Sequence, residues 1–199
     1  VYERIEMELK TITEMGFISY FLMNWDIVSY ARSKGYFYVG RGSGANSVIA
    51  YLLRITNVDP IELDLYFERF INLYRTNPPD FDIDFSWQDR DDVTKYIFNR
   101  FEHVALVATY NTFQYRAVIR ELGKVFGLPK AEIDKLSRGY LQNTDSNYLA
   151  SLVLKYGKYI EGFPSHLSIH SSGIIISEQP INYFSACFMP PKGFPTIQL

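Results

Sequence analysis

Three aspartates alternate with three apolar residues in one short stretch of this chain, Pro79-Asp80-Phe81-Asp82-Ile83-Asp84-Phe85. Successive residues of a β-strand point to opposite faces, so the pattern predicts a strand with one apolar and one acidic face. Three carboxylates held that close together repel one another unless a cation neutralises them. Hard divalent cations such as Mg2+ prefer carboxylate oxygen, and two of them about 3.5–4 Å apart can clamp a phosphoryl displacement. The stretch is therefore a candidate metal site.

Two other interpretations of this stretch stay open. An EF-hand calcium loop also begins Asp-x-Asp-x-Asp, but it needs Gly at its sixth position and Glu at its twelfth. Counted from Asp80, those positions hold Phe85 and Asp91, and apolar alternation is not typical of a loop. An ordinary solvated strand face would show the same alternation, although aspartate is depleted in strands.

A glycine-rich segment, Gly40-Arg41-Gly42-Ser43-Gly44-Ala45-Asn46-Ser47, precedes a predicted helix. Glycines let the backbone turn tightly and present N–H groups to an anion, and the helix adds the positive end of its dipole. Ser43 and Ser47 can donate hydroxyl hydrogen bonds, and Arg41 can grip phosphate with its fork of donors. The segment is neither a Walker loop nor a dinucleotide fingerprint. Taken by itself the segment favours a structural turn. Beside a metal-binding strand it predicts a triphosphate site.

Three cations share one face of a predicted helix, because Arg116, Arg120 and Lys124 follow one another at intervals of four residues. Such a ridge can contact a nucleic-acid backbone, which positions the ligand without reading its sequence. The alternative is a solvated helix face.

Histidine and cysteine add little chemistry to this chain. His166 and His170 have the wrong setting for a two-histidine metal site, since their segment leads into a strand. We expect a polar turn there, ahead of a strand over 173–177. The single cysteine, Cys187, excludes an internal disulfide framework and a cysteine-based zinc site, and it fits a reducing compartment.

Composition indicates a globular chain rather than a nucleic-acid coat. Of 199 residues, 47% are hydrophobic and 17% aromatic, and the net charge of -2 leaves any nucleic-acid contact to local patches. The sequence has no apolar run long enough for a membrane span and no signal peptide. Since Val1 stands where an initiator Met is expected, we expect a fragment of a longer protein.

These candidate residues need a mixed framework of helices and strands to position them. Periodicity and breakers predict strands over 36–39, 80–85, 104–108 and 173–177. They predict helices over 2–15, 20–33, 45–53, 64–72, 114–126, 130–138 and 146–156, with another from Ser86 or Asp89 to about 101. We expect an α+β core, 1–113 and 165–199, interrupted by a helical insertion over 114–164.

Several blocks together resemble the bacterial C-family replicative polymerases, the family of the DNA polymerase III alpha subunit. They follow the family's order over nearly the whole chain, which is more specific than any one block. The blocks are Gly-Arg-Gly-Ser-Gly-Ala at 40–45, Leu-Asp-Leu-Tyr-Phe-Glu-Arg-Phe at 63–70, the aspartate stretch at 79–85, Ala-Val-Ile-Arg-Glu at 117–121 with Gly-Lys-Val at 123–125, and His-Ser-Ser-Gly-Ile-Ile-Ile at 170–176.

The resemblance implies a palm domain of the polymerase-beta/nucleotidyltransferase type, formed by 1–113 and 165–199, with 114–164 as the thumb. It implies that Asp82 and Asp84 are the catalytic metal ligands and that Asp80 is a flanking acidic residue. The same resemblance implies that the loop binds the incoming triphosphate and that the thumb contacts the DNA backbone. The residues concerned are Arg41, Gly42, Ser43 and Gly44 in the loop, and Arg116, Arg120 and Lys124 in the thumb.

The activity implied is template-directed addition of dNTPs to a primer 3′-hydroxyl with two Mg2+ ions. The implied partners are primer–template DNA, the incoming dNTP and, in the longer protein, a sliding clamp and a proofreading exonuclease. A bacterial cytoplasmic protein without membrane contact is expected.

Two departures from the family pattern bear on this expectation. The approach to the glycine-rich loop, Tyr38-Val39-Gly40, is shorter than in the family. The family's third catalytic aspartate is expected beyond Leu199, and its fingers and PHP domains do not match this chain. We therefore expect an inactive palm–thumb fragment. The alternatives are a non-catalytic nucleic-acid or nucleotide binding module, and a template-independent nucleotidyltransferase with a third carboxylate inside the chain.

Overall fold

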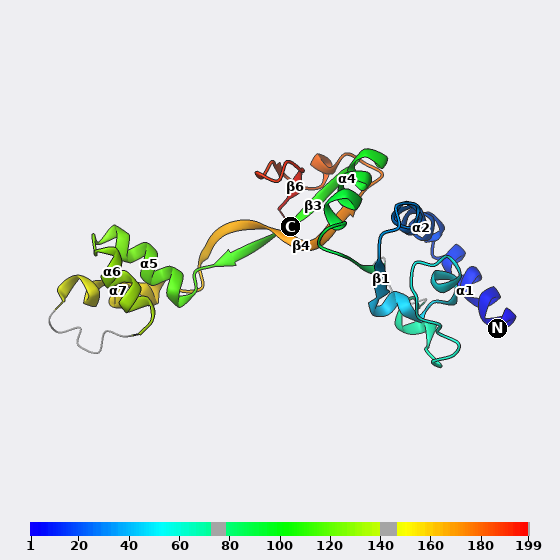
Figure 1. Ribbon diagram of the computed structural model, residues 1–199, viewed down its shortest axis with the longest axis horizontal. Helices are drawn as coiled ribbons and strands as arrows, with labels where there is room; N and C mark the ends of the chain where they lie inside the picture. The colour runs from blue at the N-terminus through cyan, green and yellow to red at the C-terminus, as the bar shows by residue number, and fades with distance from the viewer. Residues whose placement is uncertain (73–78, 140–146, 199) are drawn as a thin grey trace. The chain divides into compact units, whose positions relative to one another are not determined.

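The structure is a computed structural model that describes residues 1–72, 79–139 and 147–198 (Figure 1). Helices accompany a two-stranded and a four-stranded β-sheet, which confirms the α+β class. The chain divides into two compact units, Val1–Glu102 and His103–Leu199. Within the described ranges, no helix has both the length and the apolar character that crossing a bilayer requires.

The first unit is mostly helical and holds one small sheet. Its antiparallel strands β1 and β2 pair Tyr38 with Phe85 at one end and Arg41 with Asp82 at the other. Short 3-10 turns form at Gly42–Asn46 and Phe67–Arg69. The regular elements are α1 (Tyr2–Glu14), α2 (Ile18–Ser33), β1 (Tyr38–Arg41), α3 (Val48–Leu52), β2 (Asp82–Phe85) and α4 (Arg90–Arg100).

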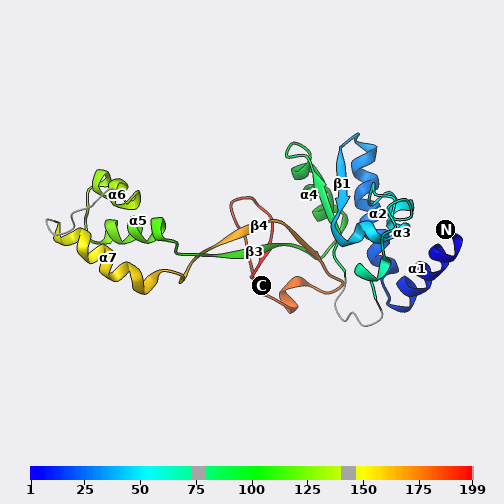
Figure 2. The ribbon, with the colours of Figure 1, turned by 90° about the horizontal axis from the view of Figure 1, so that it is seen from below.

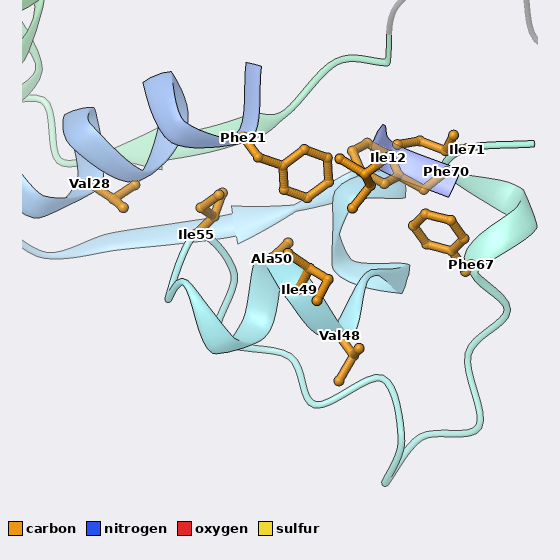
Figure 3. Packing of buried hydrophobic residues seen from close by; sticks show 10 residues of the cluster. All are labelled: Ile12, Phe21, Val28, Val48, Ile49, Ala50, Ile55, Phe67, Phe70 and Ile71. Atoms are coloured by element: carbon orange, nitrogen blue, oxygen red, sulfur yellow. The ribbon is translucent and has the colours of Figure 1, made fainter. Parts of the chain in front are cut away.

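An apolar core joins the helices of the first unit to the aspartate strand. Phe81 and Ile83 pack against this core, and the centroid of the Phe81 ring lies 4.9 Å from that of Phe70. The predicted apolar face of the strand is thereby confirmed at Ile83, and Phe81, just before the strand, packs against the same core. Figure 3 shows the buried members of the core: Ile12, Phe21, Val28, Val48, Ile49, Ala50, Ile55, Phe67, Phe70 and Ile71.

Two tyrosines, one in α2 and one just after it, hold this part of the chain against α4, the helix that follows β2. The hydroxyls of Tyr30 and Tyr36 donate to the Asp92 carboxylate at 2.7 and 3.0 Å. The hydrogen bond to Asp92, then burial, raises the pKa of Tyr30 to about 12. The bonds from Tyr30 and Tyr36 lower the pKa of Asp92, because they stabilise its charged form. The segment after Asp84 is therefore held against the body of the unit.

The second unit consists of a sheet and a helical cluster. The sheet has the strand order β4-β3-β6-β5, with β3 antiparallel to β4 and parallel to β6. In the chain the helices lie between β3 and β4, as Figure 2 lets the reader follow by colour, and they have their own core around Ile119 and Val153. The elements are β3 (Val104–Thr112), α5 (Tyr115–Val125), α6 (Lys130–Ser137), α7 (Tyr148–Ile160), β4 (Pro164–Ile176), β5 (Cys187–Phe188) and β6 (Thr196–Ile197). Residue 146, where a helix was expected to begin, lies outside the described ranges.

The helix expected over 64–72 is wrong. Only the 3-10 turn Phe67–Arg69 forms there. Asp64 has a φ of 49°, in the left-handed region, which is incompatible with a continuous right-handed helix. Phe67 and Phe70 are both buried, so packing into the core rather than helical periodicity sets the path of this segment.

The polar turn expected at 166–173 is also wrong, because these residues belong to the long strand β4. The pairing with β3 shifts between Leu106 and Ala108, whose partners are Ile174 and Ile169. Inside this irregularity the His170 Nδ1 accepts the backbone N–H of Gly173 at 2.9 Å. The polar residues therefore make a local distortion within a strand, a long-range feature that local turn signals do not reveal.

Candidate metal and phosphate site

Two carboxylates of β2 converge on one arginine of β1. The Arg41 Nε donates to the Asp84 Oδ2 at 2.5 Å, and its Nη1 lies 3.4 Å from the Asp82 Oδ2. The register that pairs Arg41 with Asp82 brings the three side chains together. All three are about half exposed, at 57% for Arg41, 44% for Asp82 and 57% for Asp84.

Arg41 supplies the positive charge that the acidic strand was expected to need. Its pKa is raised by the hydrogen bond to Asp84, and further by the charges of Asp84 and Asp82, while burial works against this shift. The sequence by itself favours a metal ion as the neutralising charge, whereas the structure places Arg41 beside both carboxylates. The available signal was an arginine two residues after the strand expected over 36–39, but its partner depends on the β1–β2 register.

Asp80 lies outside β2, the strand that holds the other two aspartates. β2 begins only at Asp82, since Arg41 is the last residue of β1 and the Phe81 N–H is bonded to the Tyr20 hydroxyl at 2.9 Å. Within the described ranges, no group of three or more His, Cys, Asp or Glu side chains is arranged to hold a metal ion. The expected cluster of three carboxylates is therefore reduced to a pair.

The carboxylate pair fits part of a divalent-metal site. Oδ2 of Asp82 and Oδ2 of Asp84 both approach the guanidinium of Arg41, so two hard oxygen ligands already face a common cation. Mg2+ binds through one or two carboxylates and keeps several waters. Asp82 and Asp84 meet that requirement, and a second ion would need further ligands.

The glycine-rich loop follows β1 directly and packs against β2. Gly42 has a φ of 71°, and a Cβ at this position would collide with the carboxylate of Asp82. A Cβ on Gly44 would collide with the ring of Phe81. The loop closes as a 3-10 turn in which the Asn46 side-chain amide donates to the Ser43 carbonyl at 2.8 Å. These glycines are thus needed for packing beside the carboxylates, whatever ligand the loop holds.

The helix after the loop is not available to a phosphate, contrary to expectation. Its first residue is Val48 rather than 45, and the fully buried Glu8 already accepts the N–H groups of Val48 and Ile49 at 3.1 and 3.3 Å. The Ser47 hydroxyl, expected to face a ligand, donates to the Glu8 Oε2 at 2.8 Å. The positive end of the α3 dipole is therefore occupied by a carboxylate of the protein itself.

Arg4 completes this internal anion site. Its Nε lies 2.7 Å from the Glu8 Oε1, and its Nη2 donates to the carbonyls of Asn46 and Leu65 at 3.1 and 3.0 Å. Neither Arg4 nor Glu8 is among the functional residues predicted from the sequence. The available signal was a glutamate on the same helix face as Ile5 and Ile12, where a buried residue is expected.

The cationic ridge lies on the exposed side of α5. Arg116 and Arg120 are exposed, whereas Val118 and Ile119 on the other side of the helix are buried. Lys124 is exposed as well, and its Nζ donates to the Glu121 carboxylate at 2.8 Å. Part of the positive charge of the ridge is therefore already balanced.

A separate hollow of about 830 Å³ lies near the first residue of β1. Aromatic and arginine side chains line it, including Tyr36, Phe37, Tyr51, Arg32 and Arg54. Neither Arg41 nor the two carboxylates belong to its lining, so the hollow and the carboxylate pair are distinct features of the first unit.

Comparison with known proteins points to one family. The family model described as the bacterial DNA polymerase III alpha NTPase domain matches residues 1–198. The error-prone DNA polymerase of Symbiobacterium thermophilum is 36% identical, over 97% of this chain and 20% of that protein. Those of Pseudomonas paraeruginosa and Ruegeria pomeroyi are 38% and 40% identical, over 92% and 89% of this chain and 19% and 18% of theirs. The chain thus spans about a fifth of the length of the curated relatives it matches.

Proposed function

Because this chain belongs to the family of the bacterial DNA polymerase III alpha subunit, we propose that it carries part of the active site of a template-directed DNA polymerase. The activity proposed is that of a whole protein acting in the bacterial cytoplasm, of which this chain is one part. The convergence of Asp82 and Asp84 beside the glycine-rich loop is the observation that carries the proposal.

We assign Asp82 and Asp84 to holding the Mg2+ ions of this site. With Mg2+ held by these two carboxylates, the site would supply a lower pKa for the primer 3′-hydroxyl and positive charge opposite the triphosphate and the departing pyrophosphate. Asp80, which lies before β2, is assigned a flanking role without direct contact with the ions. The geometry of β2 supports this division, since Asp82 and Asp84 belong to the strand and both contact Arg41, whereas Asp80 precedes the strand.

The loop next to these carboxylates is assigned to the incoming triphosphate. Arg41 offers a fork of charged donors, and Gly42 and Gly44 allow the backbone to approach closely, with the Ser43 hydroxyl beside them. The work of these residues is positioning and electrostatic stabilisation, because phosphoryl transfer asks little covalent chemistry of the protein. The helix dipole of α3 makes no part of this proposal, since Glu8 occupies it.

We further propose that 1–113 and 165–199 form a palm of the polymerase-beta type and that 114–164 forms a thumb. Support comes from the helices between β3 and β4, which pack around a core of their own. The exposed Arg116 and Arg120 suit contact with the phosphates of primer–template DNA. The longer protein would also meet a sliding clamp and a proofreading exonuclease.

Primer extension by the full-length protein tests the proposal, with Mg2+ and all four dNTPs. We expect Asp82→Asn and Asp84→Asn each to slow extension at least about a hundredfold, the scale of losing one preorganised electrostatic contact. Asp91→Asn, an exposed aspartate in the first turn of α4, is the matched control and should extend as the unaltered protein does. Duplex binding should survive in all three variants. Undiminished extension by Asp82→Asn would contradict the assignment of Asp82 as a metal ligand.

A nucleic-acid binding module without catalysis is the second candidate for these 199 residues by themselves. This reading is favoured because, within the described ranges, only two carboxylates come together and no third joins them to hold a metal ion. Duplex binding by the isolated chain without any extension would support this reading. A template-independent nucleotidyltransferase would instead extend a primer without template.

A further inference from the structure

Two roles assigned to the site compete for the same atoms. Asp82 and Asp84 are assigned to metal ions, and Arg41 to the triphosphate. In the structure, however, Arg41 holds the Oδ2 of both aspartates. A metal ion bound by these oxygens leaves no place for the guanidinium between them.

We propose that Arg41 is an exchangeable counterion of the metal site. Without a divalent cation it neutralises Asp82 and Asp84. When a divalent cation takes the two carboxylates, the freed guanidinium turns to the triphosphate. This inference rests on the proposed function, since it uses the metal-binding role assigned to the two aspartates.

The exposure of the three side chains makes the exchange feasible. Arg41 and the two aspartates are each about half exposed, and ion pairs between exposed side chains are weak. A second arginine–carboxylate pair of this unit, Arg4 with Glu8, differs in its burial. Glu8 there is fully buried and accepts bonds from a hydroxyl and two backbone N–H groups as well as from Arg4. The first pair can open at little cost, whereas the second is part of the core.

The backbone around Arg41 keeps the guanidinium close to both positions. The pairing of β1 with β2 fixes the Arg41 Cα opposite Asp82, and Gly42 begins the turn of the loop immediately afterwards. Only the long side chain needs to move. Until it does, its positive charge prevents repulsion between the two carboxylates and so keeps the metal ligands in place.

Coupling between metal and triphosphate follows from this exchange. A divalent cation that frees Arg41 makes a donor available to the triphosphate, so the cation strengthens triphosphate binding. By reciprocity, a triphosphate that holds Arg41 strengthens binding of the cation.

Competition predicts tighter metal binding when Arg41 is removed. We would measure Mn2+ affinity of the full-length protein by calorimetry without nucleotide. Arg41→Ala should bind about three- to tenfold more tightly than the unaltered protein, the scale of an exposed ion pair. Arg90→Ala removes another exposed arginine, which lies 4.0 Å from Asp91, and should leave the affinity unchanged. Asp82→Asn should weaken binding.

Chemical modification reports directly on whether the guanidinium leaves. Phenylglyoxal reacts with accessible guanidinium groups, and mass spectrometry locates the modified residue. Mg2+ should speed modification of Arg41 severalfold, a dNTP added with Mg2+ should slow it again, and the rate at Arg90 should stay constant.

The outcomes separate this inference from the proposed function. If Asp82→Asn binds Mn2+ as well as the unaltered protein does, the metal-ligand assignment fails and the exchange fails with it. If Asp82→Asn weakens binding but Arg41→Ala equals the unaltered protein, only the exchange is overturned. Tighter binding by Arg41→Ala with no effect of Mg2+ on modification of Arg41 also overturns it, because the arginine then acts by charge without moving.

Discussion

At the scale of single residues, two arginine–carboxylate contacts with different surroundings organise the first unit. Arg4 and Glu8 lie one turn apart on α1, and the buried carboxylate of Glu8 caps α3. Arg41 spans Asp82 and Asp84 at the surface. Desolvation makes the first contact costly to break, whereas solvent screens the second.

Glu8→Gln is expected to lower the free energy of unfolding by about 3 kcal/mol, because it leaves Arg4 without its charged partner in a largely buried place. Urea denaturation measures the loss. Glu14→Gln on the same helix is the control, since its contact with Lys10 at 3.9 Å is exposed, and it should cost less than about 0.5 kcal/mol. Equal losses in the two variants would contradict the role of burial at Glu8.

At the scale of elements, the turn between β1 and α3 sets the position of Asp82. Gly42 adopts a φ of 71° and lies so close to the Asp82 carboxylate that a side chain would displace it. The loop and the strand therefore depend on each other, and a change in the loop reaches the proposed metal ligand.

Gly42→Ala is expected to cost about 1 kcal/mol of stability for its left-handed φ and also to weaken Mn2+ binding by displacing Asp82. Gly16→Ala separates the two effects, because Gly16 has a φ of 73° but open space around it. It should show the stability loss in urea denaturation with unchanged Mn2+ affinity in calorimetry. Weakened Mn2+ binding by both variants would mean that general destabilisation, not Asp82, is the cause.

At the scale of the whole molecule, charge balance limits how the chain meets nucleic acid. With 20 Lys and Arg against 22 Asp and Glu, the chain has no general attraction for DNA, so a local ridge must supply it. Arg116, Arg120 and Lys124 on α5 form such an exposed ridge. The charge of Lys124 is partly balanced by its hydrogen bond to the Glu121 carboxylate.

Arg120→Ala is expected to reduce the slope of log affinity against log salt for duplex DNA by about 0.9, the value of one phosphate contact. Lys10→Ala, an exposed cation on α1 that lies near Glu14, is the control and should leave the slope unchanged. Duplex affinity of the full-length protein between low and moderate salt measures both. If Arg120→Ala has the same slope as the unaltered protein, the predicted contact between α5 and DNA is contradicted.

Local patterns in the sequence were enough to predict much of this protein. Alternation placed Phe81 and Ile83 against the core, helical periodicity found α1, α2 and α5, and the order of the motif blocks identified the family that the comparisons show. These features depend on neighbouring residues or on the order of blocks, both of which are read along the chain. The roles of Asp82, Asp84 and the loop stay predictions.

Tertiary structure decided which charges meet. Arg41 reaches Asp84 because of the register between two strands far apart in the chain, and Glu8 reaches Val48 because α1 docks on α3. The same long-range packing left Asp80 outside β2 and replaced the expected helix over 64–72 with a short turn. Such contacts depend on the mutual burial of distant segments, and no local pattern encodes which buried or half-buried charge will find which partner.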